Sequence, residues 1–293
     1  MTIKKFAYTQ QLGWSVSRFD KFTACKRQYY YDYYGSFDNE FGKEKIDHLK
    51  KLTSLALEAG NITHDVIKAL LERLLKSEKP INRARFIKYA RKCANDYCAK
   101  KIFSEVYYHT KPSVLPQDVL VIVEPALMNA LNSPRFEWIS KNAIANKDGW
   151  VIEPAGYGET RINGIKAYCK VDFLFPIQDK YYILDWKTGK KDEIKHKKQM
   201  LGYTTWASYH FDTTADKILP FVAYLIPNYQ ELSFTFTQND ISDFAQRVEK
   251  EIKQLHSYCL DPASNIPLEK KEFTQTENLK ICGYCNYREL CRR

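Results

Sequence analysis

The sequence predicts a single α/β domain, on three observations. Apolar residues recur at helical spacing over 55–75, whereas from Trp150 to Leu184 β-branched and aromatic residues alternate between glycines. A further helical stretch, about 192–209, stands between strand-like segments, as is typical of α/β folds. At 293 residues and 44% apolar content, the chain can bury a core of its own.

The elements follow in order. We expect helices over 14–34 (capped by Ser15 or Ser17), 55–75, 83–108, 119–131 and 134–146, with a loop at 110–118. Strands and hairpins then occupy 150–184, and the 192–209 helix follows them. We expect two further strands near 218–226 and 232–236, a helix over 240–258, and a cysteine-rich tail.

Composition narrows the class of protein. The chain carries 45 Lys and Arg against 35 Asp and Glu, a formal charge of +10, and is rich in tyrosine, which permits nucleic-acid binding. No apolar run approaches the roughly 18–20 residues of a membrane-spanning helix, and the N-terminus lacks the apolar core of a secretion signal. We therefore expect a cytoplasmic protein without a membrane partner.

An acidic hairpin carries the strongest chemical signal. Alternate residues from Ile165 to Phe175 are expected to share one face of a single strand, so Asp172 points to its other face. Asp185 and Lys187 share a face of the returning strand. A turn centred near Gln178 and Asp179 sets positions 172 and 185 opposite each other, with Cβ atoms roughly 4.5–5.5 Å apart. Two opposed carboxylates need a cation, and oxygen ligands suit Mg²⁺ or Mn²⁺ better than Zn²⁺. The alternative is a solvated hairpin whose acids pair with lysines.

Four motifs in order resemble one nuclease family. They are Gly60 and His64 in GNITH, Asp172 in KVDFLF, Asp185-Trp186-Lys187-Thr188-Gly189-Lys190, and Gln199 and Tyr203 in QMLGY. Together they resemble the PD-(D/E)xK nuclease superfamily in its RecB-like/AddB-like exonuclease branch. The resemblance implies a restriction-endonuclease-like mixed sheet flanked by helices, and a Mg²⁺- or Mn²⁺-dependent deoxyribonuclease, specifically an exonuclease.

The same resemblance assigns roles and boundaries. The catalytic residues would be Asp172, Asp185, Lys187, Gln199 and Tyr203, and the metal ligands His64, Asp172, Asp185 and the backbone carbonyl of Trp186. Residues 1–293 would form one nuclease domain. Its parts would be an N-terminal segment (1–54), a helical insertion (80–147), a catalytic sheet core (150–237) and a cysteine-rich tail (260–293).

The tail contains Cys282-x₂-Cys285-x₅-Cys291, one ligand short of a tetrahedral site. A four-cysteine site can hold zinc or an iron–sulfur cluster, and spacing does not decide between them. Resemblance to iron–sulfur nucleases of this branch supplies Cys25, in SVSRFDKFTACKRQYYY, as the fourth ligand of a 4Fe–4S cluster that staples the terminal regions. Lys26 stands where that family usually has proline.

The expected partner is DNA, in single-stranded form or at strand ends. Its backbone would follow Lys190, Lys191, Lys195, Lys197 and Lys198, unless this run is merely a solvated face. The setting would be recombination, repair, or CRISPR-type or phage DNA processing. The chain has no G-x-x-x-x-G-K-(S/T) loop, so unwinding would need a helicase or another partner protein.

Two other classes remain open. One is a catalytically inactive iron–sulfur scaffold that binds DNA within a recombination complex, and the other is a zinc-stapled interaction protein. Loss of activity normally removes an acid or the lysine, and Asp172, Asp185 and Lys187 are all present. That favours an enzyme.

Overall fold

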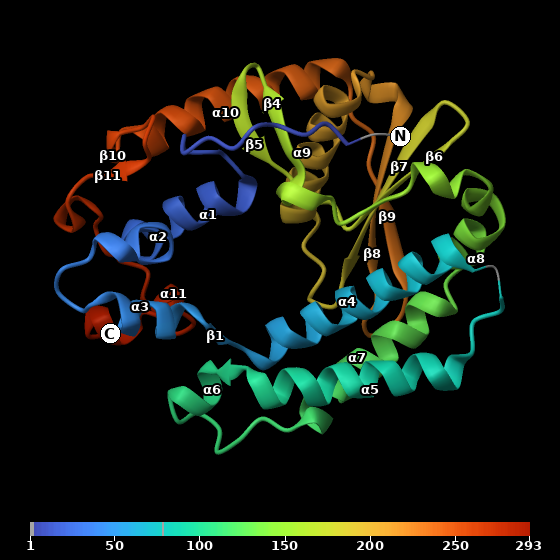
Figure 1. The fold of residues 1–293 in the computed structure, drawn as a ribbon, viewed down its shortest axis with the longest axis horizontal. Helices are drawn as coiled ribbons and strands as arrows, with labels where there is room; N and C mark the ends of the chain where they lie inside the picture. The colour runs from blue at the N-terminus through green and yellow to red at the C-terminus, as the bar shows by residue number, and fades with distance from the viewer. Residues whose placement is uncertain (1–2, 78) are drawn as a thin grey trace.

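A mixed five-stranded sheet forms the centre of the computed structural model, which describes residues 3–77 and 79–293 (Figure 1). The spatial order is β3-β6-β7-β8-β9, in which β7 and β8 are parallel and every other pair is antiparallel. This confirms the expected α/β class. The strands are β3 (Val151–Ile152), β6 (Phe173–Ile177), β7 (Lys180–Lys187), β8 (Ile218–Tyr224) and β9 (Gln230–Ser233).

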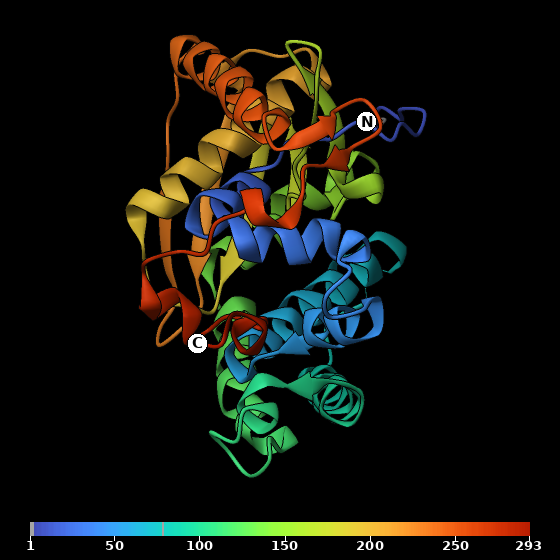
Figure 2. The same cartoon turned by 90° about the vertical axis from the view of Figure 1, so that its left-hand side faces the viewer.

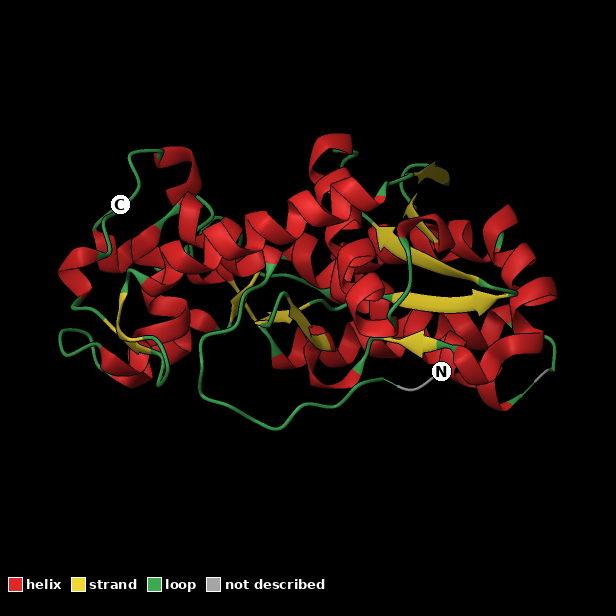
Figure 3. Cartoon of the chain, turned by 90° about the horizontal axis from the view of Figure 1, so that it is seen from above, coloured by secondary structure: helices red, strands yellow, loops and turns green. Residues whose placement is uncertain are grey.

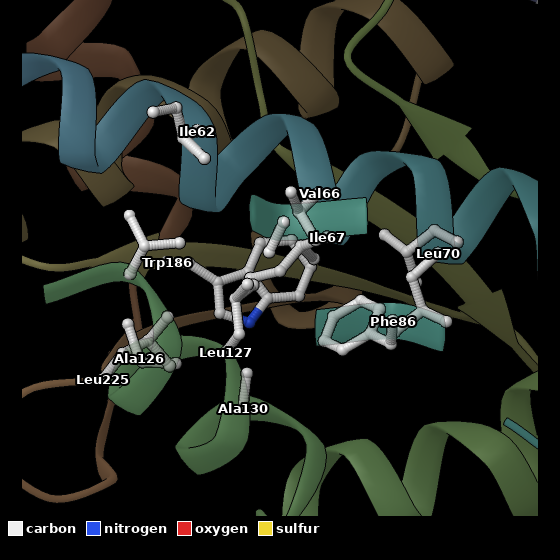
Figure 4. Close-up of a cluster of buried hydrophobic side chains, with 14 of the residues drawn as sticks. Ile62, Val66, Ile67, Leu70, Phe86, Ala126, Leu127, Ala130, Trp186 and Leu225 are labelled. Carbon is white, nitrogen blue, oxygen red and sulfur yellow. The ribbon is translucent and has the colours of Figure 1, made fainter. Parts of the chain in front are cut away.

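Helices cover both faces of this sheet (Figures 1 and 3). On one face, α9 (Glu193–Phe211) packs Met200 and Trp206 against Leu174, Ile183 and Val222. On the other, α4 (Leu55–Lys76) and α7 (Pro116–Leu131) pack against the alternate residues of the strands. Figure 4 shows this second layer, in which Ile62 and Val66 of α4, Leu127 of α7 and Trp186 of β7 form part of one cluster of buried side chains.

The 80–147 segment is helical, as expected. It contains α5 (Arg83–Lys100), β2 (Ile102–Phe103), α6 (Ser104–Tyr107), α7 and α8 (Pro134–Trp138). Figure 1 shows α5 and α7 beside α4, and the buried side chains of all three helices share a core with the sheet. The short strand β2 pairs in parallel with β1 (Leu52–Thr53), just before α4.

The N-terminal helices and the C-terminal tail pack around a second, aromatic core (Figure 2). Tyr29, Tyr30 and Tyr31 are buried with Phe273 and Tyr287 of the tail. The elements of this region are α1 (Val16–Ala24), α2 (Lys26–Tyr34), α3 (Lys43–Lys50), α10 (Gln238–His256), β10 (Cys259–Asp261), β11 (Ile266–Pro267) and α11 (Leu279–Cys282).

Four expected helices differ in the structure. The 14–34 helix is interrupted at Cys25, whose extended backbone ends α1 while its sulfur caps α2 by accepting the Gln28 N–H; Ser15 is confirmed as the N-cap of α1. The 83–108 helix ends at Lys100, because residues 102–103 pair with β1. The 134–146 helix unwinds after Trp138 into a π-helical turn and a 3₁₀ stretch, and α7 begins earlier, with Pro116 at its first position.

The expectation of one continuous strand face from Ile165 to Phe175 was wrong. The chain forms β5 (Ile165–Tyr168), which pairs with β4 (Glu159–Ile162) in a separate ribbon, and re-enters the main sheet at Phe173. Gly158, at φ +62°, accepts the Cys169 N–H at the break, and a Cβ there would lie 2.0 Å from the Cys169 carbonyl oxygen. Only glycine fits this crossing. Among the described residues, no helix is long and apolar enough to cross a membrane.

Candidate active site at the ends of β6 and β7

The hairpin register places the two acids as expected. β6 and β7 pair from Ile177↔Lys180 to Phe173↔Leu184, so the next pair would be Asp172 and Asp185. Asp172 lies just before β6, where the Trp186 N–H donates to its Oδ2 at 3.0 Å. The carboxylate thus takes the place of a backbone acceptor that the broken strand no longer supplies. This bond fixes Asp172 beside the end of β7.

Asp185 is fully buried and is held from two sides. Gln199 Nε2 and the Tyr203 hydroxyl, one helical turn apart on α9, donate to its Oδ1 at 3.2 and 3.3 Å, and Gln199 also donates to Tyr203 at 2.7 Å. Lys187 Nζ lies 2.5 Å from the other oxygen, Oδ2. The Lys187 ammonium thus pairs with the carboxylate oxygen that Gln199 and Tyr203 leave free.

His64 reaches the same place from α4. Its Nδ1 lies 3.3 Å from Asp172 Oδ2. Gly60, one turn earlier, faces the end of β7, where a Cβ would lie 3.4 Å from Thr188 Oγ1. The structure therefore gathers His64, Asp172, Asp185, Lys187, Gln199 and Tyr203 around one strand end.

The charges at this site are strongly coupled. Burial and the Asp172 carboxylate raise the pKa of Asp185 to about 6. Burial also raises the pKa of Asp172, but His64 and Lys187 outweigh it and leave that pKa below its ordinary value. Burial lowers the pKa of His64, but the two carboxylates have the larger effect and raise it to about 9. The same two carboxylates also raise the pKa of Lys187. Two cations thus compensate two buried carboxylates.

The donor set fits a divalent cation. The buried carboxylate of Asp185 and the partly buried one of Asp172 are oxygen ligands of the kind Mg²⁺ and Mn²⁺ prefer. The Lys187 carbonyl accepts a hydrogen bond from the Leu225 N–H, on the β8 side of β7. Because successive carbonyls of a strand point to opposite sides, the Trp186 carbonyl points to the side on which Asp172 lies. Within residues 3–77 and 79–293, the structure contains no group of three His, Cys, Asp or Glu side chains close enough together to hold one ion.

The five lysines proposed to track DNA differ in exposure and in their partners. Lys190, Lys191, Lys195 and Lys197 are exposed, on the loop before α9 and on its first turns. Lys191 pairs with Glu193 at 2.8 Å, and the half-buried Lys198 pairs with Asp20 at 2.7 Å. Residues 189–195 are all exposed, and His196 is the first buried residue of α9.

Cys25, Cys282, Cys285 and Cys291 line a single pocket, together with Gln28 and Tyr31. All four are free thiols. Burial is the main reason that the pKa of Cys285 rises to about 11. The hydrogen bond from the Tyr287 amide lowers this pKa, and the nearby Cys25 and Cys291 thiols raise it further. Thiols held protonated in this way need a bound cation to ionise.

Two features of the site escaped the sequence analysis. Glu153, directly after β3, donates its backbone N–H to the Asp172 carbonyl at 3.1 Å. His196 Nδ1 and the Tyr224 hydroxyl, 2.5 Å apart, form a hydrogen bond beside Lys187, and burial followed by the Lys187 charge lowers the pKa of His196. The sequence pattern does not reveal either feature. Glu153 is a single glutamate after a two-residue strand, and His196 is 28 residues from Tyr224.

One comparison with known proteins identifies the family of this chain. A family model described as the PD-(D/E)XK nuclease superfamily matches residues 13–292. No curated protein matches the chain. Among solved structures, a crystal structure of SSO0001 is 16% identical; the alignment covers 64% of this chain and 77% of that one, with a TM-score of 0.31, too low to bear on the fold.

Proposed function

Because the chain belongs to the PD-(D/E)XK nuclease superfamily, we propose that it is a Mg²⁺- or Mn²⁺-dependent deoxyribonuclease acting as an exonuclease. The observation that carries the proposal is the ion pair between Lys187 and the buried Asp185, next to Asp172. Carboxylates that face each other are unfavourable unless a cation compensates them, and here the two lie opposite each other at a strand end.

Asp172, Asp185, His64 and the Trp186 carbonyl would hold the cation. A divalent cation there would bind the scissile phosphate and lower the pKa of the attacking water. His64 must lose its proton to serve as a ligand, because a ring nitrogen that binds metal cannot carry one. Lys187 stays protonated at neutral pH, and its ammonium can orient the water or offset charge on the phosphate in the transition state.

Gln199 and Tyr203 act as positioning residues in this proposal. Both donate to Asp185 Oδ1, which leaves Oδ2 paired with Lys187. Fixing the ligand in this way costs no reorganisation during the reaction. The exposed Lys190, Lys191, Lys195 and Lys197, with Lys198, would attract the DNA backbone.

The four cysteines around one pocket support a 4Fe–4S cluster, for which zinc is the competitor. In a four-iron cluster each thiolate binds a different iron, so the sulfurs stand further apart than around a single ion. The cluster would join α1 and α2 to the tail. In the same proposal residues 1–293 are one nuclease domain with 80–147 as an insertion, since its helices share a core with the sheet.

A cleavage assay on purified full-length chain tests the proposal. Single- and double-stranded DNA, labelled at either end, is incubated with Mg²⁺, Mn²⁺ or EDTA. We expect a metal-dependent ladder of shortened products that starts from one end, and its order gives the polarity. DNA left intact with both metals, by protein that binds DNA, would instead favour the inactive scaffold. Internal cuts without end dependence would overturn the exonuclease assignment alone.

A further inference from the structure

A row of three carboxylates crosses the ends of three neighbouring strands. β3 pairs with β6 through Val151↔Leu174 and Ile152↔Phe173, so the next position sets Glu153 opposite Asp172. The β6–β7 register sets Asp172 opposite Asp185 in turn. The Glu153 N–H donates to the Asp172 carbonyl, and the Glu153 backbone is left-handed at φ +42°. Glu153 therefore turns away from strand geometry directly beside the proposed nuclease site.

Two lysines converge on the Glu153 carboxylate. Lys68 Nζ lies 3.3 Å and Lys170 Nζ 2.8 Å from the same oxygen, Oε2. The Glu153 side chain is only 10% exposed, whereas those of Lys68 and Lys170 are 35% and 53% exposed. A largely buried carboxylate thus lies beneath two ammonium groups that remain accessible from solvent.

The charges of this group do not cancel. One carboxylate needs one cation, and the second lysine leaves the trio with a net positive charge. Asp172 and Asp65 also lie near Lys170; the Trp186 amide donates to Asp172, and the Tyr97 hydroxyl donates to Asp65. A phosphodiester, with one negative charge and unshared oxygens, complements two ammonium groups over one carboxylate.

The position of the trio also fits a nucleic-acid strand. Lys68 follows His64 by four residues on α4, about 6 Å along the helix axis, and lies on the same side of it. That displacement is comparable to one nucleotide step along an unstacked strand. Lys170 lies two residues before Asp172. A strand whose scissile phosphate lies at Asp172 and Asp185 would bring a neighbouring phosphate to the two lysines.

We propose that Lys68 and Lys170 form a second phosphate-binding site, which takes an internal phosphate of the DNA strand next to the scissile one, with Glu153 as the residue that positions them. The inference rests on the proposed function, because it assumes a DNA strand at the strand-end site. The competing account is that both lysines only neutralise Glu153, so that three carboxylates can stand in a row.

Binding without cleavage tests the proposal. Full-length protein in EDTA is titrated against fluorescein-labelled single-stranded DNA by fluorescence anisotropy over a range of salt concentrations. Lys68→Ala/Lys170→Ala should weaken binding several-fold and lower the slope of log K against log salt by about 0.7, the value for one lost contact on a single strand. The matched control is Lys141→Ala/Lys271→Ala, which removes two exposed, ion-paired lysines elsewhere and should leave the slope unchanged.

Neutral-phosphate scanning locates the contact. Each phosphate of the oligonucleotide is replaced in turn by an uncharged methylphosphonate. At one position, the methylphosphonate should lower the affinity of wild type several-fold but leave the affinity of the Lys68→Ala/Lys170→Ala variant unchanged. An unchanged profile in that variant, while wild type binds and cleaves DNA, would overturn the second phosphate site and leave the nuclease proposal standing. A wild type that neither binds nor cleaves DNA would overturn both.

Two further variants keep the test decisive. If the double variant fails to fold with Glu153 unpaired, Lys68→Gln/Lys170→Gln/Glu153→Gln removes all three charges, and the same scan applies. Glu153→Gln alone should bind unmodified DNA no more weakly than wild type. The methylphosphonate at the sensitive position should lower its affinity by no more than half as much as it lowers that of wild type. A tenfold loss of Mn²⁺ affinity in Glu153→Gln would show instead that this carboxylate helps to hold metal, and would overturn its positioning role.

Discussion

The amide of Trp186 donates to the carboxylate of Asp172 at 3.0 Å, which joins the end of β7 to an acid that lies just outside β6. Asp172 is thereby fixed next to Asp185 although the strand that should carry it is broken at residues 169–172. The two acids then depend on His64 and Lys187 for compensating charge. The local chemistry of the site follows from this arrangement.

Removing the donors to Asp185 should impair the site without unfolding the protein. Gln199→Ala/Tyr203→Phe leaves Asp185 Oδ1 without its two side-chain donors. We expect Mn²⁺ affinity, measured by calorimetry, and cleavage rate to fall by about 10–100-fold, as is usual when partners of metal ligands are lost. Tyr209→Phe, which removes an exposed hydroxyl from the same helix, is the control and should change neither. Equal losses in both variants would point to a general defect in α9.

The His64–Asp172 pair should make the metal-free protein less stable at alkaline pH. The pKa of His64 is about 9 in the folded chain and 6.5 ordinarily, so the folded state binds the proton more tightly. This contribution is fully present below pH 6.5 and is lost as pH rises through 9. At about 1.4 kcal/mol per pKa unit, the loss is on the order of 3 kcal/mol.

Urea unfolding in EDTA at pH 6 and pH 9.5 measures this effect. Wild type should lose more free energy of unfolding between the two pH values than His64→Gln, which cannot titrate there. The same loss in both proteins would show that His64 is not charged by its neighbours.

The four-cysteine pocket predicts a coloured protein. Purified anaerobically, wild type should contain about four irons per chain and absorb visible light, because thiolate-ligated iron–sulfur clusters have charge-transfer bands and d¹⁰ zinc has none. Cys285→Ser should lose this colour and lower the melting temperature, whereas Cys98→Ser, outside the pocket, should do neither. A colourless protein with stoichiometric zinc would replace the iron assignment, and full metal retention by Cys25→Ser would remove Cys25 from the ligand set.

Neutralising the start of α9 should weaken DNA binding. In Lys195→Ala/Lys197→Ala/Lys198→Ala, each lost phosphate contact should lower the salt slope by about 0.7–0.9. Lys195 and Lys197 are exposed, while Lys198 is engaged with Asp20, so most of the effect should come from the first two. If the anisotropy titration gives the wild-type slope, this run is a solvated face and the DNA follows another path.

Much of the site could be predicted because short-range geometry determines it. A two-residue turn sets the β6–β7 register, and that register alone places Asp172 opposite Asp185 and puts Lys187 on the face of Asp185. Helical spacing likewise places Gln199 above Tyr203 and Gly60 above His64.

The parts that were missed depend on contacts between distant segments. The break before Asp172 depends on the close approach of Gly158 to Cys169, which the alternation of Ile165 to Phe175 does not reveal. Glu153 gains its place from the β3–β6 pairing, and its partner Lys68 comes from a helix 85 residues earlier. The sequence placed Cys25 inside one continuous helix. Its extended backbone instead separates α1 from α2. Local periodicity carries no signal for such contacts.

Cleavage of end-labelled DNA by Lys187→Ala and Asp172→Ala, compared with wild type in Mn²⁺, tests the central claim most directly. Both variants should retain the circular dichroism spectrum of wild type and lose at least a hundredfold in rate. EDTA should abolish the wild-type activity, because the buried carboxylates act through a bound cation. Cleavage at the wild-type rate by folded Lys187→Ala or Asp172→Ala would contradict the assignment of the nuclease site to the ends of β6 and β7.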